Sequence, residues 1–390
     1  MNKLIQIQDT CNLLKASANF RETHALSLCS AAHVTYNKKT ALLLASNNYL
    51  GLTHHPKVQA AAKKAIERYG TGSGGSRLTS GTHPLYEDLE KRIASFKQES
   101  SALIFGTGYM ANVGVISALA DKTDDVIFSD ELNHASIIDG CRLSKGKTLI
   151  YSHSNMDDLA KLLKTTPCSG QRFILTDGVF SMDGDIAKLD EIVYLAQKYD
   201  AMVMVDDAHA TGVIGPDGKG TAAHYNLCGK ISVEIGTLSK SLAAEGGFVA
   251  GSDLLINYLM NKARSFIFST ALSPASIASA DTALQVLQAE PWRVDRLKEK
   301  SRLFKTRLLA AGLDVLPSET PILPILTSSA SRTMAIAANL EEHGLLVSAI
   351  RPPTVPQGQS RLRLTVTDAH NEDELVDAAA RIGQIFKTID

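Results

Sequence analysis

The chain has 390 residues, a length typical of two or three domains rather than one small domain. Its 40 Lys and Arg residues nearly balance its 41 Asp and Glu residues, so the formal charge is −1, which argues against nucleic acid or a membrane surface as the main partner. Apolar residues make up 44% of the chain, enough for a sizeable core. No apolar run approaches the roughly 20 residues of a membrane-spanning helix.

The five cysteines are odd in number, widely spread and without a C-x-x-C pair. This usage argues against a disulfide scaffold or a zinc knuckle, and we expect no metal site. The first 20 residues contain no apolar stretch of signal-peptide length. We therefore expect a cytoplasmic protein.

The N-terminal part of the chain is expected to be helical over residues 1–45 and to pack near the C-terminal domain. The first clear helix follows, from Pro56 to Tyr69, because Pro stands at its start and Gly70 just past its end.

Between residues 102 and 251, short apolar β-type runs alternate with amphipathic helical segments. This alternation predicts βαβ crossovers and a mainly parallel sheet. The run Met202–Val205 is continuously apolar, as expected of a strand that is buried on both faces. The predicted strands are 102–105, 125–128, 148–151, 172–176, 201–205, 232–237 and 247–251, and the predicted helices between them are 109–120, 155–164 and 189–199.

The pattern changes after a long helical stretch, residues 273–311, which Pro291 interrupts. Strands are predicted at 313–316, 322–327, 345–350 and 362–366, and helices at 331–343 and 371–387. This order predicts a smaller α+β domain. The expected organisation is an N-terminal segment (1–45), a large domain (46–290) and a small C-terminal domain (291–390).

Two glycine clusters suggest close approach of a ligand. The segment from Gly106 to Ala111 matches G-x-G-x-x-A after a strand, which fits a phosphate cradle, a nicotinamide site or a plain tight turn. The acidic residue expected about 20 positions on would be Asp124, Asp125 or Asp130, and the first two precede their strand, which argues against nicotinamide. The cluster from Tyr69 to Arg77 lacks the Walker lysine and could admit a ligand or a partner subunit, or simply form a flexible loop.

Polar side chains follow three predicted strands, and the carboxyl ends of parallel strands share one edge of a sheet. Asp206 ends a buried strand, and a buried carboxylate needs a cation or donors. Lys240 follows another strand, where desolvation would lower its pKa and favour a nucleophilic amine. The two could form a core ion pair, or a pyridoxal phosphate site in which Thr237, Ser239 and the glycine turn bind phosphate.

Five segments carry a family resemblance: ASNNYLGL (45–52), TDGVFSMDGD (176–185), VDDAHATGVIG (205–215), IGTLSKSLAAEGGFVAG (235–251) and IRPPTVPQGQSRLRLTVTDAH (350–370). In this order they resemble the α-oxoamine synthase family of fold-type I pyridoxal phosphate enzymes, and IRPPTVP is most similar to its biotin-pathway branch. The resemblance implies an α/β fold with a large, mainly parallel-sheet domain and a smaller α+β domain. Asp177 departs from it, since relatives often have glutamate there.

The resemblance also implies roles for single residues at the cofactor. Lys240 would hold pyridoxal phosphate covalently, Asp206 would face the ring nitrogen, and His134 would stack on the ring. His209 and Ser181 would contact the ring oxygen. The remaining implied cofactor positions are Gly108, Tyr109, Thr237 and Ser239, with Ser269 and Thr270 reaching across a homodimer from the neighbouring subunit.

For substrates, the resemblance implies that Arg363 binds the amino-acid carboxylate, with Arg361 as the rival. Asn47 would lie near the substrate, and Arg21 and Thr354 would contact an acyl-CoA. The implied reaction is a decarboxylative condensation of L-alanine with pimeloyl-CoA or a pimeloyl carrier protein, with glycine and acetyl-CoA as the alternative pair. Parts of the pattern also fit an aminotransferase or lyase of the same fold, a dehydrogenase, or a scaffold without enzymatic activity.

Overall fold

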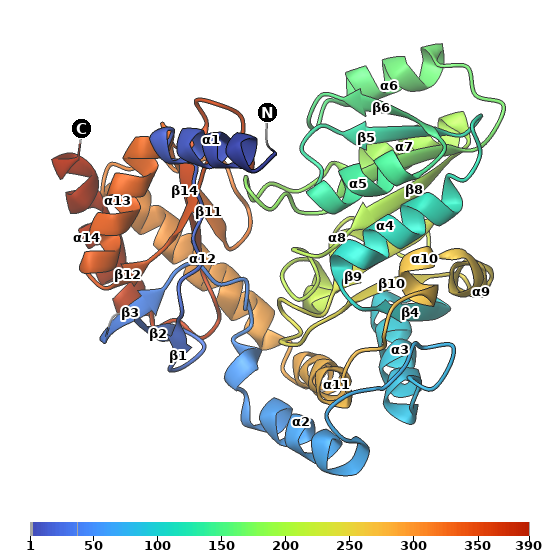
Figure 1. Cartoon of the computed structure of the whole chain (residues 1–390), viewed down its shortest axis with the longest axis horizontal. Coiled ribbons are helices and arrows are strands. Elements are labelled where there is room, and N and C mark those ends of the chain that lie inside the picture. Colours follow the sequence, from blue (N-terminus) through green and yellow to red (C-terminus); the bar gives the residue numbers. More distant parts are fainter. Residues whose placement is uncertain (1–2, 37, 390) are drawn as a thin grey trace. The chain divides into compact units, whose positions relative to one another are not determined.

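The computed structural model describes residues 3–36 and 38–389 and divides into two compact units (Figure 1). The first unit comprises Met1–Tyr49, Met182–Gly184 and Arg296–Asp390, and the second Leu50–Ser181 and Asp185–Asp295. Within the described ranges, none of the helices has the length and apolar character needed to span a membrane.

The second unit is built on a seven-stranded sheet in the order β4-β10-β9-β8-β7-β5-β6. Strand β10 runs antiparallel to both of its neighbours, and the four pairings from β9 to β6 are parallel. The mainly parallel sheet predicted from the alternating pattern is therefore confirmed. The strands are β4 (Ser101–Phe105), β5 (Val126–Asp130), β6 (Lys147–Tyr151), β7 (Arg172–Asp177), β8 (Ala201–Asp206), β9 (Val233–Thr237) and β10 (Gly247–Gly251).

Both faces of this sheet are covered, which explains the unbroken apolar runs of its strands. Along β8, Met202 and Met204 pack into one core cluster, whereas Val203 and Val205 pack into the other. The first cluster includes side chains of α4 (Gly108–Leu119), α5 (Ala135–Leu143), α9 (Asp253–Lys262) and α10 (Arg264–Ile267). The second includes side chains of α6 (Met156–Thr165), α7 (Leu189–Tyr199) and α8 (Thr221–His224).

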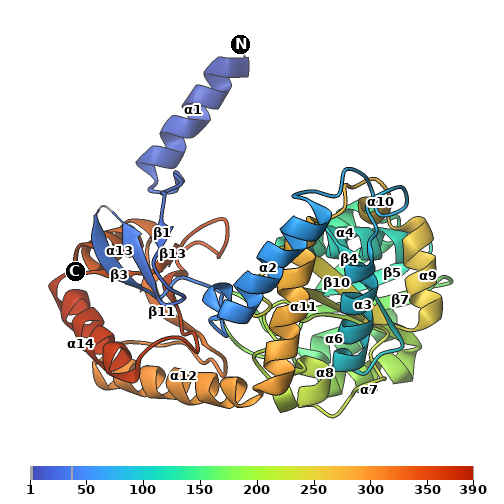
Figure 2. The ribbon, with the colours of Figure 1, turned by 90° about the horizontal axis from the view of Figure 1, so that it is seen from below.

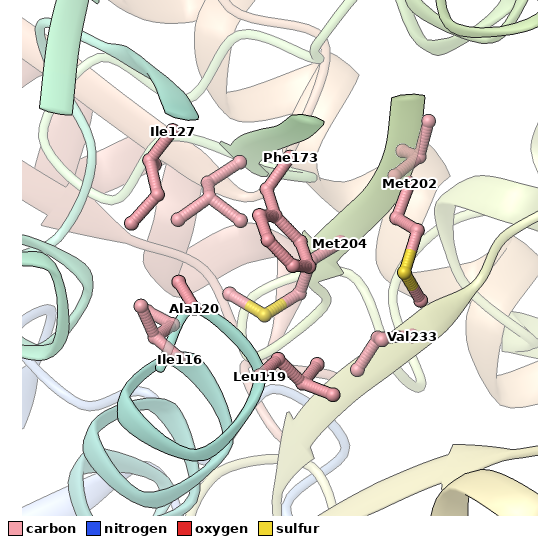
Figure 3. A pocket seen from close by; sticks show the side chains of 10 residues that line it. Ile116, Leu119, Ala120, Ile127, Phe173, Met202, Met204 and Val233 are labelled. Atoms are coloured by element: carbon pink, nitrogen blue, oxygen red, sulfur yellow. The ribbon is translucent and has the colours of Figure 1, made fainter. Parts of the chain in front are cut away.

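The first of these clusters contains a small cavity of about 10 Å³ (Figure 3). All its lining residues are apolar: Ile116, Leu119, Ala120, Ile127, Phe173, Leu175, Met202, Val203, Met204 and Val233. A space of this size offers no polar partner to a water molecule and stays dry. It is a packing defect in the core rather than a ligand site.

Three further helices, α2 (Pro56–Tyr69), α3 (Pro84–Lys97) and α11 (Pro274–Ala289), pack together beside β4 (Figure 2). Helix α2 has Pro56 at its first position and ends at Gly70, whose φ is 82°, as its sequence predicts. Two 3₁₀ helices, η1 (Leu52–His54) and η2 (Pro216–Gly218), complete the unit.

The first unit holds two small sheets, ordered β1-β2-β3-β12 and β11-β14-β13. The predicted helices after Pro291 are all present. The bounds are α1 (Lys3–Ala16), β1 (Ser27–Leu28), β2 (His33–Tyr36), β3 (Lys39–Leu43), α12 (Trp292–Ala310), β11 (Ile322–Ser328), α13 (Ala330–Glu342), β12 (Leu345–Leu346), β13 (Ser348–Ile350), β14 (Ser360–Thr365) and α14 (Glu372–Thr388).

The structure corrects the predictions for this unit in three places. The helix expected over residues 1–45 ends at Ala16, none of its residues is buried, and Figure 2 shows it extending away from the rest of the unit. Residues 27–28, 33–36 and 39–43 form strands instead. The strand expected at 313–316 is a single bridge between Val315 and Ile325, and the one expected at 345–350 divides between both sheets.

Candidate active site

A cavity of about 220 Å³ lies at the carboxyl ends of β7, β8 and β9, all within the second unit. The convergence of these strand ends, predicted from the sequence, is therefore observed. The lining residues are Thr107, Gly108, Tyr109, Asn112, His134, Ser136, Asp177, Ser181, Asp206, Ala208, His209, Thr237, Ser239 and Lys240.

The glycine turn brings the N-terminus of α4 against the end of β9. The Thr107 side chain caps the helix by accepting from the backbone N–H of Met110 at 3.0 Å. A Cβ on Gly108 would lie 3.3 Å from Cβ of Thr237, and a Cβ on Gly247 would lie 2.5 Å from the backbone nitrogen of Gly108. Because a Cβ at Gly247 has no room, glycine at that position lets the N-terminus of α4 approach β10, and Gly108 and Thr237 line the same cavity. The N–H groups at a helix N-terminus suit a bound phosphate.

Asp206 is buried at the end of β8, where its carboxylate accepts two hydrogen bonds. Nδ2 of Asn112 donates to Oδ2 at 2.6 Å, and the backbone N–H of Ala208 donates to Oδ1 at 2.9 Å. These donors offset the cost of burying the charge. Lys240 is half-buried and lines the same cavity.

The neighbouring carboxylate, Asp207, faces a different set of partners. Nζ of Lys97 lies 2.6 Å from Oδ2 of Asp207 and 3.0 Å from Oε2 of Glu234, and all three side chains are buried. Burial alone would lower the pKa of Lys97, but the two carboxylates outweigh it and raise that pKa. Burial raises the pKa of Glu234 to about 7, although Lys97 opposes the rise.

His134 caps α5 and is fixed from two sides. Its backbone N–H donates to Oδ2 of Asp177 at 2.8 Å, and its Nδ1 lies 2.7 Å from Oγ of Ser136. Burial lowers the pKa of His134 and Lys240 lowers it further, while Asp206 partly opposes them. The imidazole is therefore neutral near pH 7.

Asp177, the departure from the family pattern, supports His134 from the end of β7. Burial raises the pKa of Asp177 well above its usual value, and Asp206 raises it further. The His134 N–H and Lys240 act in the opposite direction. Although aspartate is shorter than the glutamate of relatives, Asp177 still accepts a hydrogen bond from the backbone N–H of His134.

Nine of the predicted cofactor residues line this cavity: Gly108, Tyr109, His134, Ser181, Asp206, His209, Thr237, Ser239 and Lys240. Ser269 and Thr270 do not line it. The backbone of Thr270 instead pairs with Ser76, next to the second glycine cluster. Sequence reasoning missed Asn112 and Ser136, although Asn112 stands one helical turn after Gly108 and Ser136 two residues after His134.

Of the predicted substrate residues, His134 lines the cavity of the second unit, and the others belong to the first unit. The buried Arg363 donates from Nη1 to Oδ1 of Asn47 at 3.0 Å, and from Nη2 to the hydroxyl of Tyr49 at 3.5 Å. Arg361 forms a salt bridge with Asp183 and donates to the backbone oxygen of Met182.

The remaining pair lies on the surface of that unit. Nη2 of Arg21 donates to the backbone oxygen of Pro352 at 3.3 Å and lies 3.4 Å from Oγ1 of Thr354. The two residues that the resemblance assigned to an acyl-CoA are thus adjacent, although they are 333 positions apart in the chain.

Comparisons with known proteins match nearly the whole chain. A profile of the family described as "Aminotransferase class I and II" matches residues 39–382. A relative from Lysinibacillus sphaericus, named 8-amino-7-oxononanoate synthase, is 48% identical over 367 residues, which cover 94% of each chain. A serine palmitoyltransferase solved with pyridoxal phosphate aligns with a TM-score of 0.94 at 30% identity, covering 100% of this chain and 99% of its own. An 8-amino-7-oxononanoate synthase from Francisella tularensis aligns with a TM-score of 0.76 at 28% identity, covering 89% of this chain and 98% of its own.

Proposed function

The chain belongs to the aminotransferase class I and II family, and from this premise we propose that it is a pyridoxal phosphate-dependent acyltransferase of biotin biosynthesis. It condenses L-alanine with pimeloyl-CoA, or with a pimeloyl carrier protein, and releases 8-amino-7-oxononanoate, CoA and CO₂. The predicted fold type and family resemblance are confirmed. The observation that carries the proposal is the meeting of Lys240, Asp206 and the Gly108 turn in one cavity.

The cavity fits pyridoxal phosphate by size and by its donor set. The N-terminus of α4, with the hydroxyls of Thr237 and Ser239 2.7 Å apart, suits the phosphate. Lys240 supplies an amine for the covalent link, and Asp206 supplies an anionic acceptor for the ring nitrogen. When bound, the cofactor supplies an electron sink for the charge that develops at the α-carbon of an amino acid.

The chain's own residues would hold and move protons around that carbon. The Lys240 amine takes the α-proton of alanine and later returns a proton to the product. The Asp206 carboxylate, which accepts hydrogen bonds from Nδ2 of Asn112 and the backbone N–H of Ala208, would be held toward the ring nitrogen as its acceptor. His209 and Ser181 would donate to the ring oxygen, and His134 would cover one ring face.

Substrate binding falls to residues of the first unit. Arg363 would bind the amino-acid carboxylate through its two-pronged guanidinium, with Asn47 orienting it. Arg361 is the weaker candidate because Asp183 already neutralises it. Arg21 and Thr354 would contact the acyl-CoA.

The working protein is proposed to be a homodimer in the cytoplasm. Phe268, which precedes Ser269 and Thr270, is 71% exposed, as expected for a segment that meets a second copy. The five cysteines are free thiols, which suits a reducing compartment. Light scattering of the purified protein would test the dimer.

The test is a substrate matrix of alanine or glycine against pimeloyl-CoA or acetyl-CoA, read as CoA release. Alanine with pimeloyl-CoA should turn over fastest. Preference for glycine with acetyl-CoA would move the enzyme to the alternative reaction, and exchange with keto acids without CoA release would make it an aminotransferase. Lys240→Ala should lose the visible absorbance of bound cofactor and all turnover, whereas Lys230→Ala should keep both.

A further inference from the structure

A chain of buried hydrogen bonds joins Asp206 to His134 through two residues that have no assigned role. Nδ2 of Asn112 lies 2.6 Å from Oδ2 of Asp206 and 2.9 Å from Oγ of Ser136. Oγ of Ser136 lies 2.7 Å from Nδ1 of His134. Asn112 and Ser136 are each 1% exposed, so this chain is shielded from water.

The chemistry of the groups determines which atom donates and which accepts in each of these hydrogen bonds. A carboxylate only accepts, so the Asn112 atom beside Asp206 must be the amide nitrogen, and its second hydrogen points to Ser136. The Ser136 hydroxyl accepts that bond and can direct its own hydrogen to Nδ1 of His134. The backbone N–H of Ser136 also donates to Nδ1, at 3.3 Å. Nδ1 is therefore an acceptor, and the neutral ring carries its hydrogen on Nε2.

Asn112 makes this arrangement at a cost, which argues against a merely structural role. Its carbonyl oxygen is buried and has no hydrogen-bond partner. A residue chosen only to fill the space between α4 and α5 would avoid an unsatisfied acceptor. The amide is retained because its two hydrogens satisfy two different acceptors at once.

We propose that Asn112 and Ser136 are positioning residues that hold His134 as the Nε2–H tautomer and tie its orientation to Asp206. The inference rests on the proposed function, because it assigns His134 and Asp206 to the same cofactor ring. Other groups also face His134. Asp177 accepts from its backbone N–H, Lys240 lines the same cavity, and the ring of Tyr109 lies edge-on with 6.4 Å between the two ring centroids. The test must therefore isolate the contribution of Asn112 and Ser136 to the titration of His134.

Removal of the hydroxyl in Ser136→Ala leaves Nδ1 with only the longer backbone contact. The neutral form of His134 then loses its best donor, so its protonation constant should rise about tenfold, which is about one pKa unit. Asn112→Ala frees the Ser136 hydroxyl to reorient, and the change should be in the same direction. Because the two residues act in series, the double variant should shift the titration no further than the larger single change.

The measurement is a pH titration of His134 by NMR of full-length protein labelled with ¹⁵N-histidine, with the His134 signal assigned by its loss in His134→Gln. It is made with pyridoxal phosphate bound and repeated after the cofactor is removed. The matched control is Ser117→Ala, a serine of the same helix as Asn112 whose hydroxyl donates to the backbone oxygen of Val113, and it should leave the titration unchanged.

An unchanged titration and tautomer in Ser136→Ala would overturn the proposal, as would shifts that add in the double variant. If Asn112→Ala fails to fold, Ser136→Ala decides alone, since it removes a single oxygen. Failure of the proposed function would look different. The wild-type protein would then bind no pyridoxal phosphate. The titration of His134 in the cofactor-free protein would still test its hydrogen bonds through Ser136 and Asn112.

Discussion

Acidification should weaken the first unit through one buried histidine. His370 is 1% exposed, and its Nδ1 accepts from the backbone N–H of Thr367 at 3.0 Å. Its Nε2 lies 3.2 Å from the backbone oxygen of Leu43, so the neutral ring links the segment after β14 to the end of β3. Strand β14 carries Arg363, and the chain after β3 leads to Asn47.

The size of the effect follows from the pKa of this group. Burial lowers the pKa of His370 from 6.5 to about 4, with Lys300 and His33 adding to the effect. The folded state therefore binds its proton less readily than the unfolded state. The stability that this group contributes is present in full above about pH 6.5 and is lost as the pH falls toward 4. Between pH 7.5 and pH 5 the loss amounts to about 2 kcal/mol.

The assay is urea unfolding, followed by far-UV circular dichroism, of wild type and His370→Asn at both pH values. Asparagine keeps an acceptor near Thr367 but does not titrate, so the carboxylates of the chain act equally in both proteins. The free energy difference between wild type and variant should shrink by about 2 kcal/mol on acidification. A difference that stays constant, or grows, would refute the assignment of a neutral buried imidazole.

Three further outcomes are expected. The ring nitrogens of His153 lie 2.9 Å from carboxylate oxygens of Asp130 and Asp185; burial alone would lower the pKa of His153, but the two carboxylates raise it to about 10. His153→Gln should therefore lower the free energy of unfolding by about 1–2 kcal/mol at pH 7, and by less as the pH rises through 10. Urea unfolding at several pH values would measure this difference. Gly247→Ala should weaken pyridoxal phosphate binding at least about tenfold in an absorbance titration, because its Cβ meets the phosphate turn, whereas Gly72→Ala has open space and should bind normally. Val233→Ile should raise the free energy of unfolding by about 0.5–1 kcal/mol, and with it the thermal midpoint, because the added methyl group enters the cavity of Figure 3. A lower midpoint would contradict this prediction and show that the cavity is too small for a methyl group.

Most strands of the large sheet could be predicted because they are short, apolar and buried on both faces, so the pattern is local, although the edge strand β6 is partly exposed. The site could be predicted in outline for the same reason, since Asp206 and Lys240 follow such strands directly. Strands β1 to β3 could not, because they are short and partly exposed, and β3 finds its partner β12 about 300 residues later.

Asn112 shows a second limit of sequence reasoning. Inside an apolar helix, an asparagine has no local pattern that distinguishes a buried hydrogen-bond donor from a tolerated polar residue. Its role becomes visible only when Asp206, 94 positions later in the chain, and Ser136 are placed beside it. The same holds for Arg361 and Arg363, which lie on one face of β14 and differ in their partners: Arg361 pairs with Asp183, whereas Arg363 donates to Asn47.

The adjacent carboxylates at the end of β8 also protect the sheet against misassembly. Consecutive residues of a strand point to opposite sides, so Asp206 meets the amide of Asn112 while Asp207 meets the ammonium of Lys97. A slip of one residue against β7 or β9 would move one of the two anions to the other's position and leave the remaining anion without its donor. A misaligned sheet would thus bury a carboxylate without a donor, and this cost favours the native register.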